Sequence, residues 1–342
     1  MRELWHPPAD VLERTRIGAF LRWLEWEHGL RFDDYEALWQ WSVDRTAEFW
    51  RAIWDHLEII EHVAPTATLA DARMPGADWF PGARLNYAEH VLRMPGVAGA
   101  EPIVISRSQT RGPVDLTAEE LRERVRRVRA GLRRLGISKG DRVAAYAPNI
   151  PETLVLMLAT ASLGAIFSSC APEFGTRSVV DRWQQIEPKL LVAVDGYRYG
   201  AKEIDRRAEV AAIREALPSL QQTVEIAYLH EGHDGLHEGL CTWESLTEPT
   251  GEPLEFEPVP FAHPLYVLYS SGTTGLPKPI VHGHGGILLE HVKMLALHHD
   301  LGPGDRFFWF TTTGWMMWNY LVSGPAAAPA SRALRQSRMC DP

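Results

Sequence analysis

The sequence predicts an α/β fold in which mostly parallel sheets are flanked by helices, with a tryptophan-rich helical region before them. Two observations predict the sheets: short apolar or β-branched runs recur after residue 101, and amphipathic helical segments separate them. A third observation predicts the helical region, because residues 1–62 carry tryptophans and other apolar side chains at helical spacing. The apolar fraction of 45% and the charged fraction of 23% are those of a globular protein with a sizeable core.

Residues 1–98 form the predicted helical N-terminal region. Four apolar side chains recur at the spacing of a helix face: Phe49, Ile53, Trp54 and Leu57. Tryptophan stripes also serve as stacking platforms for ligands or nucleic acids, but this spacing favours packing in a core. The tryptophans of the region are Trp5, Trp23, Trp26, Trp39, Trp41, Trp50 and Trp54. An irregular connection rich in Pro and Gly follows, and the helical pattern resumes over residues 86–93.

The next part of the chain begins with a strand and a long helix. The β-branched run at residues 103–105 predicts the strand. Thr117 and Glu120 have the spacing of a capping box, and Gly136 ends the helix that this box begins. The predicted buried ladder of this helix is Leu121, Val125, Val128 and Leu132. Arginines on the same helix could form a nucleic-acid surface, but we interpret them as a solvated face because the whole chain is acidic.

Further strands and a helix complete the alternating pattern. Residues 143–147 predict a strand, and Pro151 is suited to the first position of the helix that follows. Gly164 ends that helix, and apolar runs at residues 165–167 and 190–194 predict the next strands. This rhythm indicates a parallel sheet with helices on both faces. The polar, proline-rich segment 218–263 is predicted to be an irregular exposed connection.

Charge and cysteine content exclude several classes of protein. The net charge of −9 and the pI near 5.9 argue against nucleic acid or an anionic membrane as the main partner. No apolar run is long enough to predict a transmembrane helix, and the charged N-terminus does not resemble a signal peptide. The cysteines, Cys170, Cys241 and Cys340, are far apart and form no recognisable disulfide framework. We therefore expect a cytoplasmic protein.

The segment "YSSGTTGLPKP", residues 269–279, is the strongest candidate for a binding site. It follows an apolar run and combines flexible backbone with hydroxyl groups and one cation. Successive backbone N–H groups in such a loop bind phosphate, and a lysine adds a point charge for a polyphosphate. The predicted phosphate-binding residues are Ser270, Ser271, Gly272, Thr273, Thr274, Gly275 and Lys278.

Two other interpretations of this loop are weaker. In the common P-loop the lysine follows the second glycine directly and a helix begins there, whereas Leu276 and Pro277 intervene here. Pro277 and Pro279 disfavour a helix, so we expect a strand at residues 280–281. An ordinary flexible turn would not need two hydroxyl pairs and a lysine in this order.

Histidines after the loop suggest a metal site less strongly. They are His282, His284, His291, His298 and His299. A zinc site could use their spacing, but no cysteine or H-E-x-x-H motif accompanies them, so we assign no metal ligands.

The loop and three further segments resemble the acyl-adenylate-forming superfamily. "YSSGTTGLPKP" is similar to its phosphate-loop signature, and "WFPGARLNYAEHVL" (79–92) is similar to the N-terminal signature of its short-chain acyl-CoA synthetase branch. Residues 140–175 resemble the first nucleotide-fold half, and "FFWFTTTGWMMWNYLVSG" (307–324) resembles the segment that walls the acyl pocket. The resemblance covers roughly residues 1–324 and implies a partial AMP-binding domain over residues 99–324.

Within this branch, residues 281–293 and 311–324 most resemble the enzymes that activate acetoacetate. The resemblance implies ATP-dependent ligation of acetoacetate to coenzyme A through an acyl-adenylate, with Mg²⁺ brought by ATP. Trp315, Met316 and Met317 would shape the acyl pocket, although the methionines could also be core residues. Arg198, followed by Lys202, falls where the branch binds the CoA phosphates. An acetate or propionate ligase and a non-catalytic remnant are the alternatives.

The resemblance also implies elements that this sequence does not contain. The resembled enzymes continue with an adenine-binding strand, a magnesium element, a ribose-binding aspartate and a mobile C-terminal lid domain that carries the adenylation lysine. No catalytic residue is therefore assigned. Residues 325–342 lose all periodicity and are predicted to be an irregular, non-native tail, produced for example by a frameshift. We expect a truncated N-terminal half that forms no AMP from ATP and acetoacetate.

Overall fold

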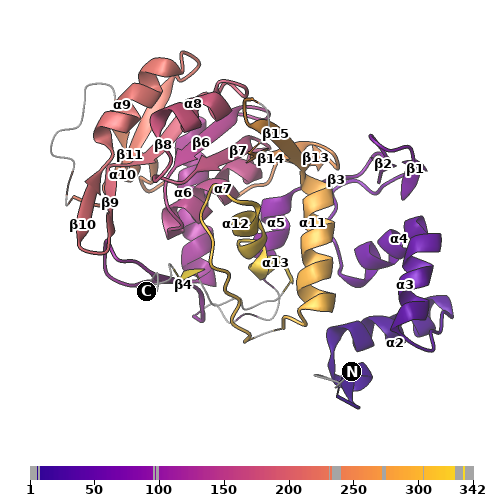
Figure 1. The fold of residues 1–342 in the computed structure, drawn as a ribbon. Coiled ribbons are helices and arrows are strands. Elements are labelled where there is room, and N and C mark those ends of the chain that lie inside the picture. The colour runs from indigo at the N-terminus through magenta and orange to yellow at the C-terminus, as the bar shows by residue number, and fades with distance from the viewer. Residues whose placement is uncertain are drawn as a thin grey trace.

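The computed structural model of the chain describes residues 6, 8–94, 97, 100–230, 232, 240–271, 275–302, 304–327 and 334–335. It has the α/β architecture that the sequence predicts. Figure 1 shows a central sheet with helices on both of its faces and a separate group of N-terminal helices beyond α11 (His284–Lys293).

The central sheet has seven strands in the order β12-β11-β8-β6-β7-β14-β15. All neighbouring pairs are parallel except β14 and β15, which form an antiparallel hairpin. The strands are β6 (Arg142–Tyr146), β7 (Ile166–Cys170), β8 (Leu190–Val194), β11 (Gln222–Ile226), β12 (Leu240–Thr242), β14 (Pro264–Ser270) and β15 (Lys278–Gly283). The strands predicted near 143–147, 165–167, 190–194 and 280–281 are confirmed.

Successive residues of the inner strands β6 and β8 enter two separate cores, one on each face of the sheet. Val143 and Ala145 of β6 join the larger core, whereas Ala144 and Tyr146 join the smaller one. This alternation follows from the two-residue period of a strand. Both faces are therefore covered, as the uninterrupted apolar strands indicated.

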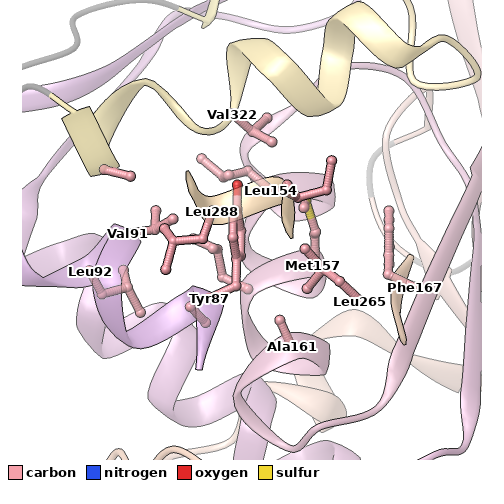
Figure 2. Close-up of a cluster of buried hydrophobic side chains, with 14 of the residues drawn as sticks. Tyr87, Val91, Leu92, Leu154, Met157, Ala161, Phe167, Leu265, Leu288 and Val322 are labelled. Carbon is pink, nitrogen blue, oxygen red and sulfur yellow. The ribbon is translucent and has the colours of Figure 1, made fainter. Parts of the chain in front are cut away.

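Helices on the larger-core face are α5 (Tyr87–Arg93), α6 (Ala118–Arg134), α7 (Pro151–Ser162), α10 (Trp243–Leu246) and α11, which continues as the π-helix η1 (Met294–His298). The smaller core lies under α8 (Thr176–Trp183) and α9 (Arg207–Ala216). Figure 2 shows how Tyr87 of α5, Met157 of α7 and Leu288 of α11 converge within the larger core. Residues distant in sequence thus form one packed interior.

Helix boundaries follow the local signals in the sequence. Thr117 accepts a hydrogen bond from the Glu120 backbone N–H, and the Glu120 carboxylate accepts one from the Thr117 N–H, so the predicted capping box of α6 is confirmed. Pro151 occupies the start of α7. Gly136 and Gly164 have positive φ angles of 75° and 65° after these helices, where glycine is unstrained.

The N-terminal region is helical, as predicted, but not all of its tryptophans are buried. Its helices are α1 (Val11–Arg14), α2 (Arg16–His28), α3 (Tyr35–Asp44) and α4 (Thr46–His56). Trp54 is buried in the core, where its ring stacks on Phe80 at 4.5 Å. The core-packing prediction is wrong for Trp26 and Trp39, which are 86% and 50% exposed. Within the described part of the chain, no other segment packs closely enough on these two side chains to bury them. Trp5 lies outside the described residues.

The segment 218–263 is more regular than predicted. It supplies β11 and β12, which extend the central sheet beyond β8, and the short helix α10. The prediction of a wholly irregular connection is therefore wrong. The part after α10 lacks regular structure until β13 (Val259–Pro260), as do residues 227–230 after β11.

Small sheets lie around the central one. They pair β1 (Leu69–Asp71) with β2 (Asp78–Trp79), β3 (Arg84–Leu85) with β13, β9 (Gly196–Tyr199) with β10 (Lys202–Asp205), and β4 (Pro102–Arg107) with β5 (Val114–Thr117) and β16 (Leu334–Arg335). The described C-terminal part forms α12 (Met316–Leu321) and α13 (Gly324–Ala327). The expected irregular tail thus begins with helical residues 325–327, and most of it lies outside the described residues.

Candidate functional site

Loops that follow the parallel strands meet at the carboxyl edge of the central sheet. In open α/β sheets this edge is where ligands bind. The predicted phosphate loop follows β14, and the loops after β6 and β7 emerge beside it because β7 neighbours both β6 and β14.

The phosphate loop closes the hairpin between β14 and β15. Ser270 pairs with Lys278 across the hairpin, so the loop spans residues 271–277. Lys278 begins a strand, as the two prolines predict, and its side chain is exposed to solvent. Gly275 has a φ of 129°, which side-chain-bearing residues rarely adopt. Gly272, Thr273 and Thr274 lie outside the described residues.

Helix α8 and the turn that follows it hold the base of this loop. The Gln185 Nε2 amide donates a hydrogen bond to the Pro277 carbonyl at 2.8 Å. The guanidinium of Arg182 lies 5.9 Å from the ring centroid of Tyr269 and 5.1 Å from that of Phe174. Burial raises the pKa of the Tyr269 hydroxyl, so this residue remains neutral. The loop therefore projects from an anchored base.

A cleft of about 430 Å³ lies at the same edge of the sheet. This volume is within the range of small-molecule sites. Its lining includes Asn149, Glu173, Arg198, Phe310, Thr312 and Trp315. Arg198 and Trp315, which the sequence suggested for different ligands, are therefore brought to one cavity. The lining is mainly apolar, with one cationic and one anionic side chain among the residues named.

Arg198 lies on the β9–β10 hairpin. Its backbone N–H donates to Thr110 Oγ1 at 3.0 Å, which fixes the hairpin against the loop before β5. Its guanidinium forms an ion pair with Glu203, and both side chains are about half exposed. Lys202 is exposed on the neighbouring strand and is not among the residues that line the cleft. The structure thus places Arg198, but not Lys202, at the cavity.

The wall formed by residues 310–318 is held to the sheet by side-chain hydrogen bonds. Thr313 Oγ1 donates to the Ala147 carbonyl at 2.7 Å, and Ser169 Oγ donates to the Thr313 carbonyl at 2.6 Å. Both bonds are buried. Thr312 Oγ1 donates to Glu173 Oε1 at 3.0 Å. These partners could not be predicted from the sequence, because no motif links the ends of β6 and β7 to a segment so far along the chain.

The three residues predicted for the acyl pocket occupy different environments. Trp315 is 63% exposed and lines the cleft. Met316 is 54% exposed, and Met317 packs against the larger core. Neither methionine is among the described residues that line this cleft.

Two of the predicted histidines belong to the interior. His284 Nδ1 accepts a hydrogen bond from the Tyr87 N–H at 3.2 Å, and His291 Nδ1 lies 2.7 Å from Ser323 Oγ. Burial lowers the pKa of each imidazole to about 3. Within the described ranges, no three His, Cys, Asp or Glu side chains lie together as a metal site requires. The zinc interpretation gains no support.

Among the described helices, none combines the length and the apolar character needed to cross a membrane.

Comparison with known families gives a clear match. A family model described as "AMP-binding enzyme" matches residues 99–331, and one described as "Acetyl-coenzyme A synthetase N-terminus" matches residues 35–91. The chain belongs to the AMP-binding enzyme family. Its AMP-binding match includes both the phosphate loop and the cleft wall.

Several relatives of this AMP-binding enzyme chain are similar to it over most of its length. Acetoacetyl-coenzyme A synthetase of Rhizobium meliloti is 44% identical over 95% of the chain and 50% of that protein. Malonamoyl-CoA synthetase of Penicillium aethiopicum is 39% identical over 95% of the chain and 46% of that protein. The structure of acetoacetyl-CoA synthetase from Streptomyces lividans matches with a TM-score of 0.93 and 49% identity, covering 98% of this chain and 51% of that one. The chain spans about half the length of the curated relatives it matches.

Proposed function

We propose that the function is ATP-dependent ligation of acetoacetate to coenzyme A, the activity of an acetoacetyl-CoA synthetase. The observation that carries this proposal is the position of the phosphate loop: an anchored hairpin with an exposed Lys278 at the carboxyl edge of a parallel sheet. The identity of 44% to a relative with that name supports the choice of acid.

The chemistry explains why a phosphate loop and an acyl cleft occur together. A carboxylate acylates thiols poorly because oxide is a very poor leaving group. Its oxygen therefore attacks the α-phosphorus of ATP, forming an acyl-adenylate and releasing pyrophosphate. The CoA thiol then attacks the acyl carbon, loses its proton and displaces AMP. Transfer at phosphorus gains mainly from positioning and charge neutralisation.

Each part of the site has a role in this proposal. Lys278 and the hydroxyl and N–H groups of residues 270–275 would hold the β- and γ-phosphates, and Mg²⁺ would enter with ATP. Trp315, Met316 and Met317 would shape the pocket for the acyl group. Arg198 would meet the CoA phosphates, and the exposed Lys202 would add charge nearby. We further propose a helical N-terminal region over residues 1–98, a partial AMP-binding domain over residues 99–324 and an irregular segment over residues 325–342. We also propose a cytoplasmic location without nucleic-acid or membrane partners.

Two alternatives remain distinct from this proposal. Ligation of acetate or propionate is favoured by the match of residues 35–91 to an acetyl-coenzyme A synthetase model. A non-catalytic remnant that binds nucleotide alone is the second alternative. Acetoacetyl and malonamoyl groups share a carbonyl on the third carbon, which acetyl and propionyl groups lack, so the similarity to both kinds of relative favours a 3-carbonyl acid.

Binding of Mg·ATP to the 342-residue chain tests the proposal. We expect Lys278→Ala to weaken binding at least about tenfold, because one charge-assisted contact to a phosphate is lost. Lys139→Ala is the matched control, because Lys139 precedes β6 at the opposite edge of the sheet. Isothermal titration calorimetry measures both variants. Equal affinity in the wild type and Lys278→Ala would refute the assignment of the loop.

A further inference from the structure

Asn149 lies where the loop between β6 and α7 reaches the cleft. Its side chain lines the cavity, yet only 4% of the residue is exposed. Asn149 Oδ1 accepts a hydrogen bond from Trp318 Nε1 at 2.9 Å. Trp318 is fully buried, and its ring lies 6.0 Å from that of Phe167 in β7. The buried Trp318 side chain therefore fixes the orientation of the Asn149 amide.

The bond to Trp318 determines which end of the amide is available. An indole Nε1–H can only donate, so the amide atom that faces it must be the oxygen. The two N–H groups on Nδ2 are then left for other partners, and no described residue accepts a hydrogen bond from them. Asn149 thus presents an oriented donor whose preferred acceptor is not part of the described protein.

Other polar groups of the cleft are committed or solvated. Thr312 donates its hydroxyl to Glu173, and Thr110 Oγ1 accepts from the Arg198 backbone. Gln109 also lines the cleft, and its side-chain oxygen accepts a hydrogen bond from the Gly200 N–H at 3.0 Å. Asn149 differs because it combines near-complete burial with uncommitted donor groups. Nδ2 is not among the buried side-chain atoms that lack a partner, so it stays accessible from the cleft, where a correctly placed ligand acceptor gains selectivity.

We infer that Asn149 Nδ2 donates a hydrogen bond to the carbonyl oxygen on the third carbon of the acyl substrate, and that Trp318 is the positioning residue for this donor. The inference rests on the proposed function and identifies how a 3-carbonyl acid is distinguished from a simple fatty acid. Trp315 lines the same cleft and supplies apolar contact to the rest of the acyl group. The ketone oxygen on the third carbon of acetoacetate corresponds to the amide oxygen of malonamate, and Asn149 Nδ2 can donate a hydrogen bond to either oxygen.

The test compares acetoacetate with butyrate, which has CH₂ in place of the carbonyl. Ligand-observed NMR titrations of the 342-residue chain give the ratio of the two dissociation constants. We expect the wild type to bind acetoacetate about tenfold more tightly, the value of one net hydrogen bond. Asn149→Asp keeps the acceptor for Trp318 but has no donor, and its charge repels both acids alike. Asn149→Leu has neither group. Both variants are expected to reduce the ratio to about one.

Further variants separate orientation of the donor from loss of folding. Trp318→Phe frees the amide to rotate, so we expect an intermediate ratio. Ser168→Ala is the matched control, because it removes the acceptor of another buried indole, that of Trp183, on the same sheet. It is expected to lower the melting temperature measured by circular dichroism while keeping the tenfold ratio.

The outcomes separate this inference from the proposed function. Preference for acetoacetate that persists in Asn149→Asp and Asn149→Leu overturns the role of Asn149 and leaves acetoacetate as the substrate. A wild type that binds the two acids equally, or neither of them, also overturns it. The proposed function is judged independently by Mg·ATP binding in Lys278→Ala.

Discussion

Three buried histidines are expected to make folding sensitive to mild acid. His90, His284 and His291 are 1%, 0% and 7% exposed. Burial lowers the pKa of each imidazole from 6.5 to about 3. His90 is the simplest case, because neither of its ring nitrogens has a hydrogen-bond partner within the described residues. Protonation of any of the three would leave a charge in the core.

The sign and size of the effect follow from proton linkage. The unfolded chain binds protons near pH 6.5 but the folded chain does not, so stability is complete above that pH and falls toward pH 3. At pH 5 the loss is about 2 kcal/mol for each histidine and about 6 kcal/mol for the three. A whole domain is stable by about 5–15 kcal/mol. Carboxyl groups with lowered pKa values, such as Glu123 at about 2, act below about pH 4.5, so the histidines dominate from pH 6.5 to 5.

Urea unfolding followed by tryptophan fluorescence measures this loss. We expect the free energy of unfolding to fall steeply between about pH 7.5 and 5, and His90→Leu to recover about 2 kcal/mol of the fall at pH 5. His28→Leu, which changes an exposed side chain, is the control and should follow the wild type. Equal stability at the two pH values would refute the reasoning, as would a fall in His90→Leu as large as that of the wild type.

Two packing predictions rest on single contacts. A Cβ at Gly131 would lie 2.0 Å from the Leu246 carbonyl oxygen, so Gly131→Ala must separate α6 from α10 and is expected to cost at least about 2 kcal/mol in urea unfolding. Gly112→Ala, which meets nothing within 4 Å, should cost far less, and similar losses in both would contradict the packing. Asn86→Ala removes a buried amide that donates to two backbone carbonyls, one of them that of Ala161, each at 2.9 Å. We expect a loss of about 2–4 kcal/mol by the same measurement, and a loss below about 0.5 kcal/mol would contradict it.

Local chemistry made much of the fold predictable. Thr117 and Glu120 determine the start of α6 through their own side chains, and Pro277 prevents a helix after the phosphate loop wherever the loop lies. Apolar strands buried on both faces likewise need no knowledge of their neighbours to be recognised. These features depend on residues only a few positions apart, so the sequence alone contains them.

Other features depend on the rest of the fold and were not predictable. The strand β11 is polar enough to resemble a loop, and it becomes a strand because β8 offers a parallel partner. Trp26 has the composition of a core residue, but α2 turns it toward solvent. Arg198 and Trp315 come from segments that no motif connects, and only the order of strands in the sheet brings them to one cleft. Sequence periodicity identifies the apolar face of a helix or strand, but it does not identify the segment that packs against that face.

The geometry of the cleft depends more on polar residues at strand ends than on the wall itself. Residues 305–311, which lead into the wall and include its first two residues, contain no helix or strand, so no regular backbone hydrogen bonding fixes their position. The buried bonds from Ser169 and Thr313, and that between Asn149 and Trp318, hold the following residues to the ends of β6 and β7. Under the proposed function, an acyl group in contact with Trp315 is positioned relative to the edge of the sheet. The proposal therefore predicts that substitutions at these anchoring residues change which acid binds, even where they leave the apolar lining intact.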